Sequence, residues 1–141
     1  MTSHHIGPFH EVPNRPGRRA RDLVGTEHGF DSVFVTENEM DHGSGIPRHT
    51  HPVEEAWVVM EGELVVEVGD EVIVAGPGSV VRVAPGVRHA VRNEGTAMVR
   101  AITAAPWDRA TFFSHATTYL EGLPAYEVAP DSSAGEQGGA R

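Results

Sequence analysis

The sequence predicts an all-β fold in which short strands form an antiparallel sandwich or barrel. Short runs rich in β-branched and apolar residues follow one another between residues 31 and 103. Turn-forming pairs such as Gly69-Asp70 and Pro85-Gly86 separate these runs roughly every eight to ten residues. The whole chain is rich in turn residues, with 16 glycines and 10 prolines among 141 residues. A chain of this length fits one domain around one core.

Eight strands are expected in the central part of the chain. The clearest pair is the hairpin at residues 65–74, because its Gly69-Asp70 turn supplies the positive φ angles that tight hairpins need. The expected strands cover residues 31–40, 49–51, 56–60, 63–68, 71–74, 80–83, 90–92 and 97–103.

The pattern divides the chain into four regions. Residues 1–30 are expected to form an extended N-terminal arm and a first strand, since Pro and Gly recur among polar residues up to Arg21. Residues 31–105 make the barrel core. Residues 106–126 close the barrel as a helical turn or a late strand, and their Phe112, Phe113 and Tyr119 fit a pocket floor or lid as well as plain core packing. Residues 127–141 have too little apolar surface to offset their ordering entropy and are predicted to be a disordered tail.

Charge and composition exclude several classes of protein. The chain has 20 acidic residues against 11 basic ones, all of them arginine, and a formal charge of -9, which disfavours binding to nucleic acid. The one basic cluster consists of Arg15, Arg18, Arg19 and Arg21. Its charge pattern favours a solvated arm, and contact with an acidic ligand or partner is the alternative. No apolar run reaches the length of a membrane span and no secretory h-region is visible, so we expect a cytoplasmic protein without membrane contact.

A group of histidines with one glutamate predicts a metal site. The sequence has no cysteine, so metal ligands must be nitrogen and oxygen atoms. His49 and His51 stand two apart and share one face of a strand, while Glu55 follows a bend at Pro52, and His89 closes a later turn. Three imidazoles and a carboxylate suit one divalent transition metal (Fe, Mn, Ni, Zn, Cu or Co) and leave two positions open in six-coordination.

A His-x-His pair alone is more often a pair of polar surface residues than a pair of metal ligands, so the assignment of a metal site depends on the longer pattern. That pattern resembles the two motifs of the cupin superfamily. The first is Gly43, five residues, His49-Thr50-His51, three residues, Glu55, six residues and Gly62; the second is Gly78, Gly86, His89 and Asn93. One position departs from it, because Ala84 stands where the family has proline and Pro85 follows.

The resemblance covers about residues 33–103 and is greatest to small single-domain bacterial cupins of the cupin 2 type. It implies a double-stranded β-helix, or jelly-roll, barrel that often forms a homodimer. It also implies that His49, His51, Glu55 and His89 are the metal ligands, and that Asn93 and the motif glycines have structural roles.

Four further side chains are candidates for a substrate pocket. If Glu55 faces the cavity, strand alternation turns Trp57 and Val59 inward too, where a pocket wall and ordinary core explain them equally well. Arg48 would clamp a substrate carboxylate if it pointed inward, although its phase favours solvent. His42 is a candidate proton shuttle at the barrel mouth or a surface residue.

The resemblance implies a metal-dependent enzyme acting on a small organic molecule, with the metal on a carbonyl or enolate oxygen. An isomerase, cyclase or dehydratase is favoured, since small polyketide cyclases share this size and the lysine-free composition suits a high-GC bacterium with secondary metabolism. A cupin dioxygenase is the alternative. A non-catalytic small-molecule-binding cupin also stays open. A DNA-linked sensor is disfavoured, because no helix-turn-helix pattern accompanies the barrel.

Overall fold

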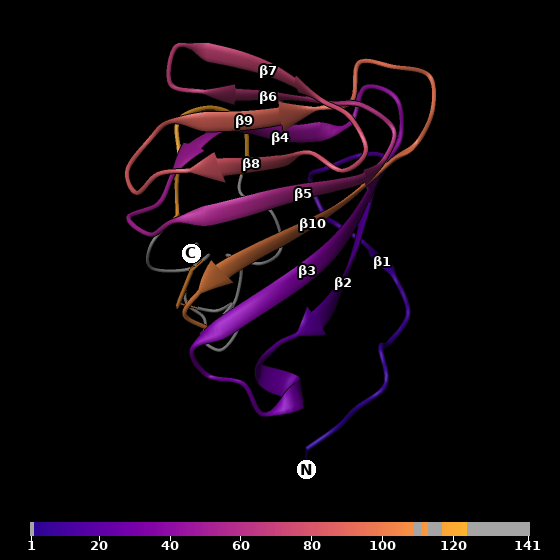
Figure 1. Ribbon diagram of the computed structural model, residues 1–141, viewed down its shortest axis with the longest axis vertical. Helices are drawn as coiled ribbons and strands as arrows, with labels where there is room; N and C mark the ends of the chain where they lie inside the picture. Colours follow the sequence, from indigo (N-terminus) through magenta and orange to yellow (C-terminus); the bar gives the residue numbers. More distant parts are fainter. Residues whose placement is uncertain (1, 109–110, 113–116, 124–141) are drawn as a thin grey trace.

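The computed structural model describes residues 2–108, 111–112 and 117–123, which form two antiparallel sheets packed face to face (Figure 1). The predicted all-β jelly roll is confirmed. The first sheet has the order β1 (His10–Glu11), β2 (Arg18–Val24), β3 (Val33–Met40), β10 (Val99–Pro106), β5 (Glu55–Glu61), β8 (Val80–Val83). The second has the order β11 (Thr118–Tyr119), β4 (Gly45–Thr50), β9 (His89–Arg92), β6 (Leu64–Val68), β7 (Glu71–Ala75). One short 3-10 helix, η1 (Thr26–His28), joins β2 to β3.

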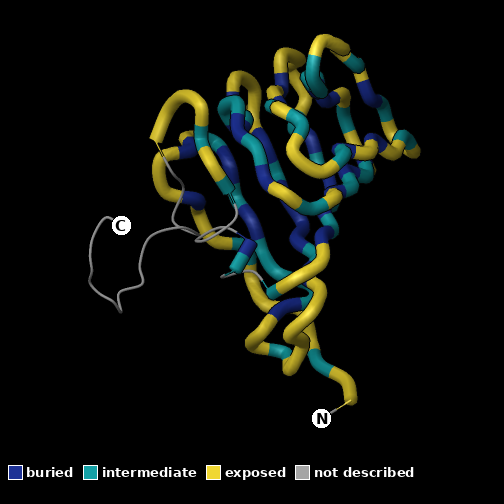
Figure 2. The backbone as a smooth tube through the Cα atoms, turned by 90° about the vertical axis from the view of Figure 1, so that its left-hand side faces the viewer, coloured by how far each residue is buried: buried dark blue, intermediate teal, exposed yellow. Residues whose placement is uncertain are grey.

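The core lies between the two sheets and follows the alternation of the strands. In β5 the side chains of Glu55, Trp57 and Val59 are buried, whereas Ala56 and Val58 are half-buried on the opposite face. This is the alternation that the sequence predicts for the strand. Buried and exposed stretches alternate in the same way along the other central strands (Figure 2).

Turn chemistry fixes the hairpin of β6 and β7. Val68 pairs with Glu71, and Gly69 between them adopts a φ of 60°, which a side chain would disfavour. The hairpin at residues 65–74 is therefore present, shifted by one residue at each end.

Asn93, the last residue of the second motif, ties three segments together. Its buried amide donates to the carbonyl oxygens of Met40 and Ala97, both at 2.9 Å, while its Oδ1 accepts from the Gly95 backbone at 2.9 Å. The structural role expected for this residue matches these contacts.

The N-terminal region contains a strand, as expected for residues 1–30, but the strand begins within the stretch up to Arg21 that is expected to be an extended arm. Residues 18–24 form the regular strand β2, which pairs with β3 from Arg18 to Val24. The interpretation of the basic cluster as a solvated arm is wrong for Arg15 and Arg18, since each is only 5% exposed. This strand shows no apolar alternation in the sequence, because its inward positions include an arginine and a small alanine.

The C-terminal region is described in part. Thr118 and Tyr119 form β11, which pairs with Thr50 and His49 of β4, so a late strand is present there. Phe113 and the predicted disordered tail at residues 127–141 lie outside the described residues. None of the helices in the described segments has the length and hydropathy to cross a membrane.

Candidate metal centre

Three strands bring the predicted ligands together at one end of the barrel, on the left in Figure 1. His49 lies near the end of β4, His51 just beyond it, and Glu55 and His89 begin β5 and β9. One donor atom from each residue lies within 4.8 Å of the others. All four side chains are buried, with 5% exposure at most.

Each of the three imidazoles is oriented by a backbone carbonyl two residues away in the sequence. If Nδ1 donates to that carbonyl, the ring is the neutral tautomer whose Nε2 lone pair is free to bind a metal ion. The Nδ1-to-oxygen distances are 2.8 Å for His49 to Pro47, 3.0 Å for His51 to Val53 and 2.9 Å for His89 to Val87.

The carboxylate completes the group. Oε1 of Glu55 accepts a hydrogen bond from the Trp57 indole at 3.2 Å and lies 3.3 Å from Nε2 of His51. Nε2 of His89 is 3.2 Å from the same oxygen, but this buried nitrogen makes no hydrogen bond of acceptable geometry in the described part of the chain. A buried nitrogen without a hydrogen bond, facing a carboxylate, fits a metal ligand.

Burial and neighbouring groups set the protonation states. Burial, reinforced by the nearby His89 ring, lowers the pKa of His49 to about 3. Burial opposes the ionisation of Glu55, but the ring nitrogens of His51 and His89 beside its carboxylate outweigh this effect and hold the pKa of Glu55 below its ordinary value. Near neutral pH, His49 is neutral and Glu55 ionised, the forms that bind a cation.

A second-motif turn holds the ligands from β4 and β9 in register. Gly86, with a φ of 78°, donates its backbone N–H to the carbonyl oxygen of His51 at 2.8 Å. His49 and His89 are direct partners in the β4–β9 ladder. These contacts hold the ligand-bearing segments together with Ala84 at the position where the family motif has proline.

Comparison with known proteins gives the family. The family model for the cupin domain matches residues 37–104, which contain all four candidate ligands. The protein is a cupin. A search of curated proteins found no match.

Solved structures share the fold of this cupin at low sequence identity. The polyketide cyclase RemF from Streptomyces resistomycificus superposes with a TM-score of 0.67 and 23% identity, over 79% of this chain and 76% of that chain. An RmlC-like cupin from Shewanella frigidimarina gives 0.65 and 20%, over 76% and 94%. A sugar phosphate isomerase of the cupin superfamily from Silicibacter pomeroyi gives 0.60 and 23%, over 66% and 61%. These likenesses establish the fold.

Aromatic rings cover the metal centre of the cupin on the side of the C-terminal region. The ring of Tyr119 lies 5.4 Å from that of His49, and the ring of Phe112 lies 4.3 Å from that of His51. Phe112 also packs edge to face on Phe34 at 4.9 Å. These two aromatic residues of the C-terminal region thus form an apolar wall beside the ligands.

The other pocket candidates fall in different places. Trp57 and Val59 face inward as members of the main core cluster, and only Trp57 contacts a candidate ligand. The inward position considered for Arg48 is wrong, because its guanidinium pairs with Glu67 at 2.9 Å and Glu121 at 3.1 Å on the outer face of the second sheet. Its phase in β4, one residue from the inward His49, explains the outward direction.

His42 is not at the barrel mouth near the metal centre. It is exposed in the turn before β4, at the opposite end of that strand from His49, where its Nδ1 lies 2.7 Å from the carbonyl oxygen of Gly95. The interpretation as a proton shuttle is therefore wrong for this position.

Sequence reasoning missed a polar group inside the barrel. Arg18 donates from Nε and Nη2 to Oδ1 of Asn38 at 3.2 and 2.8 Å, and the Asn38 amide contacts Thr103. Arg15 lies buried nearby, with its guanidinium carbon 5.2 Å from the centre of the Tyr119 ring. The only sequence signal was the pair of turns, Pro13-Asn14 and Pro16-Gly17, that brackets Arg15.

Proposed function

We propose that this cupin is a metal-dependent enzyme that acts on a small organic molecule. The observation that supports it most directly is the donor set, four buried ligand atoms within 4.8 Å of one another. Because carbonyl contacts orient the three imidazoles, the set is arranged for a metal before one binds. His49, His51, Glu55 and His89 would hold one divalent transition metal.

A bound divalent metal supplies Lewis acidity toward a carbonyl or enolate oxygen. The positioning of the ligands and the shape of the pocket come from side chains of the protein. Trp57 holds the Glu55 carboxylate in place through its indole N–H. The rings of Tyr119 and Phe112 exclude water beside His49 and His51 and offer an apolar surface to the carbon skeleton of a substrate.

The reaction class we propose is an isomerisation, cyclisation or dehydration. Two proteins with the same fold are described as a polyketide cyclase and a sugar phosphate isomerase, which supports this class without establishing it. Oxygen chemistry is the second candidate, because the same nitrogen and oxygen donors hold redox-active Fe, Mn or Cu. A protein described as an oxalate oxidase also shares the fold, with a TM-score of 0.55.

Elemental analysis of a variant without the histidines of the N-terminal segment tests the metal site. His4, His5 and His10 are to be changed to Gln rather than removed by truncation, because Val12 is buried against Ala20 and β1 pairs with β2. We expect one metal ion per chain in this background. His49→Ala and His89→Ala each lose it while circular dichroism shows an intact fold, whereas the exposed control His42→Ala keeps it.

Full metal occupancy in both ligand variants would disprove the assignment. The metal found, combined with oxygen uptake, separates the reaction classes: Fe or Cu with substrate-dependent uptake supports a dioxygenase, and Zn, Ni or Mn without uptake supports the isomerase or cyclase class. A protein that binds no metal would support the non-catalytic binding module instead.

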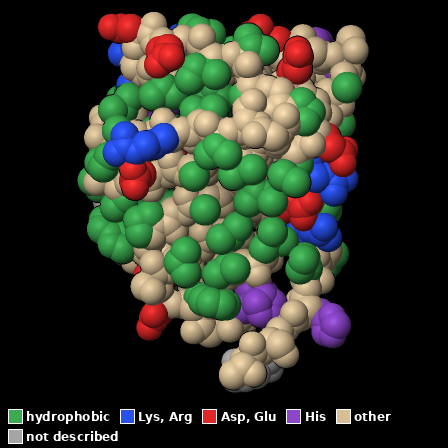
Figure 3. Space-filling view, in the orientation of Figure 1, with side chains coloured by type: hydrophobic (Ala, Val, Ile, Leu, Met, Phe, Trp, Pro, Cys, Tyr) green, Lys and Arg blue, Asp and Glu red, His purple; other side chains and the backbone are tan. Residues whose placement is uncertain are grey.

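We also propose that the protein is a homodimer. The outer face of the first sheet is apolar at its centre, where Val58, Ile102 and Ala104 are half-buried and Val80 is 66% exposed. Hydrophobic side chains gather on this side of the molecule (Figure 3). The cytoplasmic location and the absence of nucleic-acid binding expected from the sequence stay predictions.

A further inference from the structure

Arg15 is a buried cation without a counter-ion among the described residues. It is 5% exposed, and its Nε and Nη2 atoms make no hydrogen bond. Nη1 donates only to the backbone oxygen of the neighbouring Asn14, at 2.9 Å. A buried guanidinium that lacks a partner is costly, so such a group points to a ligand that completes it.

The other described arginines show how unusual this is. Seven of them lie within 4.0 Å of a carboxylate: Arg19, Arg21, Arg48, Arg82, Arg88, Arg92 and Arg100. Arg18 binds the side-chain oxygen of Asn38 with Nε and Nη2. In Arg15 the same two atoms, Nε and Nη2, make no hydrogen bond to any described residue.

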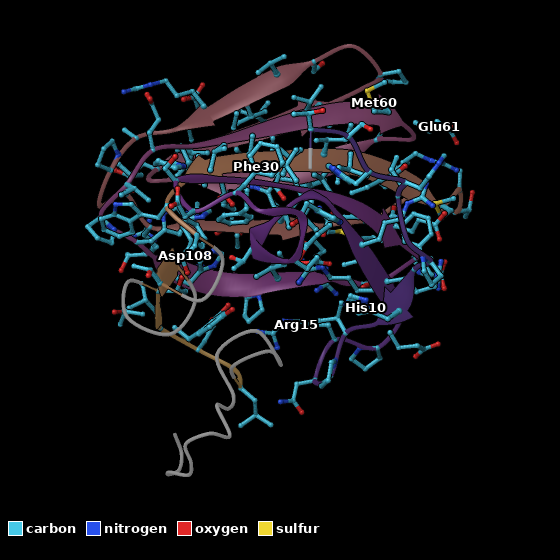
Figure 4. All side chains as sticks on the ribbon, turned by 90° about the horizontal axis from the view of Figure 1, so that it is seen from below. His10, Arg15, Phe30, Met60, Glu61 and Asp108 are labelled. Carbon is cyan, nitrogen blue, oxygen red and sulfur yellow. The ribbon has the colours of Figure 1, made fainter. Side chains whose placement is uncertain are left out.

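The backbone holds Arg15 firmly in this position. Its N–H donates to the oxygen of Val12 at 3.2 Å, and its own oxygen accepts from Arg18 at 3.0 Å. Asn14, before it, has a φ of 63°, a left-handed conformation that asparagine tolerates better than most residues. Arg15 belongs to the N-terminal segment that also carries His10, and both residues are labelled in Figure 4.

The guanidinium lies on the side of the barrel where β11 covers the metal centre. Its carbon is 5.2 Å from the centre of the Tyr119 ring, and that ring is 5.4 Å from the ring of His49. Tyr119 thus lies beside both the cation and a candidate metal ligand. Arg15 also borders a groove of about 660 Å³ that opens to the solvent on the outer face of the second sheet. Apolar Ile46, Pro47 and Leu123 and charged Arg48, Glu67 and Glu121 line this groove, and none of the four candidate metal ligands does.

We propose that Arg15 binds the carboxylate group of a small organic acid. The free Nε–H and Nη2–H lie along one edge of the guanidinium and match the two oxygens of a carboxylate. The apolar part of the acid lies in the groove that Arg15 borders, beside Ile46, Pro47 and Leu123. The binding of this carboxylate does not depend on the proposed metal-dependent function.

The test uses two probes of the same shape, benzoate and its neutral analogue benzamide. Full-length protein labelled with 15N at arginine Nε is titrated with each after removal of metal by a chelator. We expect benzoate, but not benzamide, to shift one Nε–H resonance in a saturable way. That resonance is assigned to Arg15 by its absence from the spectrum of Arg15→Gln.

Affinity measurements on variants complete the test. Arg15→Gln is expected to weaken benzoate binding by roughly tenfold to a hundredfold, because charge-assisted hydrogen bonds are lost. Arg82→Gln is the control, since that arginine is exposed and pairs with Glu54. If Arg15→Gln does not fold, Arg15→Lys replaces it. Lysine keeps the positive charge but lacks the two parallel N–H donors of the guanidinium, so weakened benzoate binding is again expected.

Three outcomes would overturn the proposal: no binding of benzoate to the wild type, equal binding of benzoate and benzamide, or unchanged benzoate affinity in the Arg15 variant. Because these measurements need no metal, they are independent of the elemental analysis. A chain that binds benzoate but no metal refutes the metal-dependent function alone, and the reverse result refutes the carboxylate site alone.

Discussion

At the scale of single residues, the metal centre depends on how each histidine is held. A backbone carbonyl lies within hydrogen-bond distance of each Nδ1 atom, and the Nε2 atoms of His51 and His89 lie beside the Glu55 carboxylate. The sequence predicts which residue types gather, but the carbonyls belong to backbone whose direction only the folded strands and turns define. Their effect is to lower the entropy lost when a metal binds.

His49 gives the metal-free protein a pH-dependent stability. Its pKa falls from 6.5 to about 3 on folding, because burial favours the neutral ring. The unfolded chain therefore binds more protons than the folded one between these values, and the free energy of unfolding decreases as the pH falls through this range. We expect a loss of about 2 kcal/mol between neutrality and about pH 5 from this residue, measured by urea denaturation.

The matched control is His49→Gln, which keeps a polar side chain but cannot take up the proton. Its free energy of unfolding should depend less on pH over the same range. Parallel profiles for the two proteins would contradict the assignment of this titration to His49.

At the scale of elements, the close pairing of β4 and β9 positions His49 opposite His89. This pairing requires glycine at position 45, because a Cβ there would lie 2.1 Å from the carbonyl oxygen of Val91. Backbone atoms cannot move aside as the end of a flexible side chain can, so β4 and β9 would have to move apart. The requirement is steric, since Gly45 has no positive φ.

We expect Gly45→Ala to lower the free energy of unfolding by about 1 to 3 kcal/mol, in the range of overpacked interiors, and to weaken metal binding. Gly76→Ala is the control, because a Cβ at position 76 would meet no other atom within 4 Å and Gly76 too lacks a positive φ. Urea denaturation and metal titration measure both effects. Equal stability of the two variants would show that β4 and β9 separate without cost.

The elements also show where sequence patterns succeed and fail. The alternation in β5 is readable because Trp57 and Val59 are apolar on the same side as Glu55. In β2 the inward positions hold Arg18 and Ala20, so the strand looks like a polar arm. Its place is decided by pairing with β3, a contact between distant residues that local composition does not encode.

At the scale of the whole molecule, the apolar outer face of the first sheet is the surface for the proposed homodimer. We expect the wild type to sediment as a dimer and Val80→Asp to weaken self-association at least about tenfold, because a charge in an apolar interface is costly. Val72→Asp serves as the control, since Val72 is 64% exposed on β7 of the other sheet. A monomeric wild type, or equal effects of both substitutions, would argue against this interface.

The sequence by itself determined the all-β fold, the cupin motifs and the four candidate ligands. These follow from short-range spacing, because turn residues end strands and two residues of separation place His49 and His51 on one face. Strand alternation already favoured an outward Arg48, but only the tertiary structure decided that Arg48 pairs with Glu67 and Glu121. It alone also decided that His42 lies at the far end of β4 and that Arg15 is buried against Tyr119. Each of these features depends on which segments far apart in the sequence pack together. Such packing produces no periodic pattern of residues along the sequence.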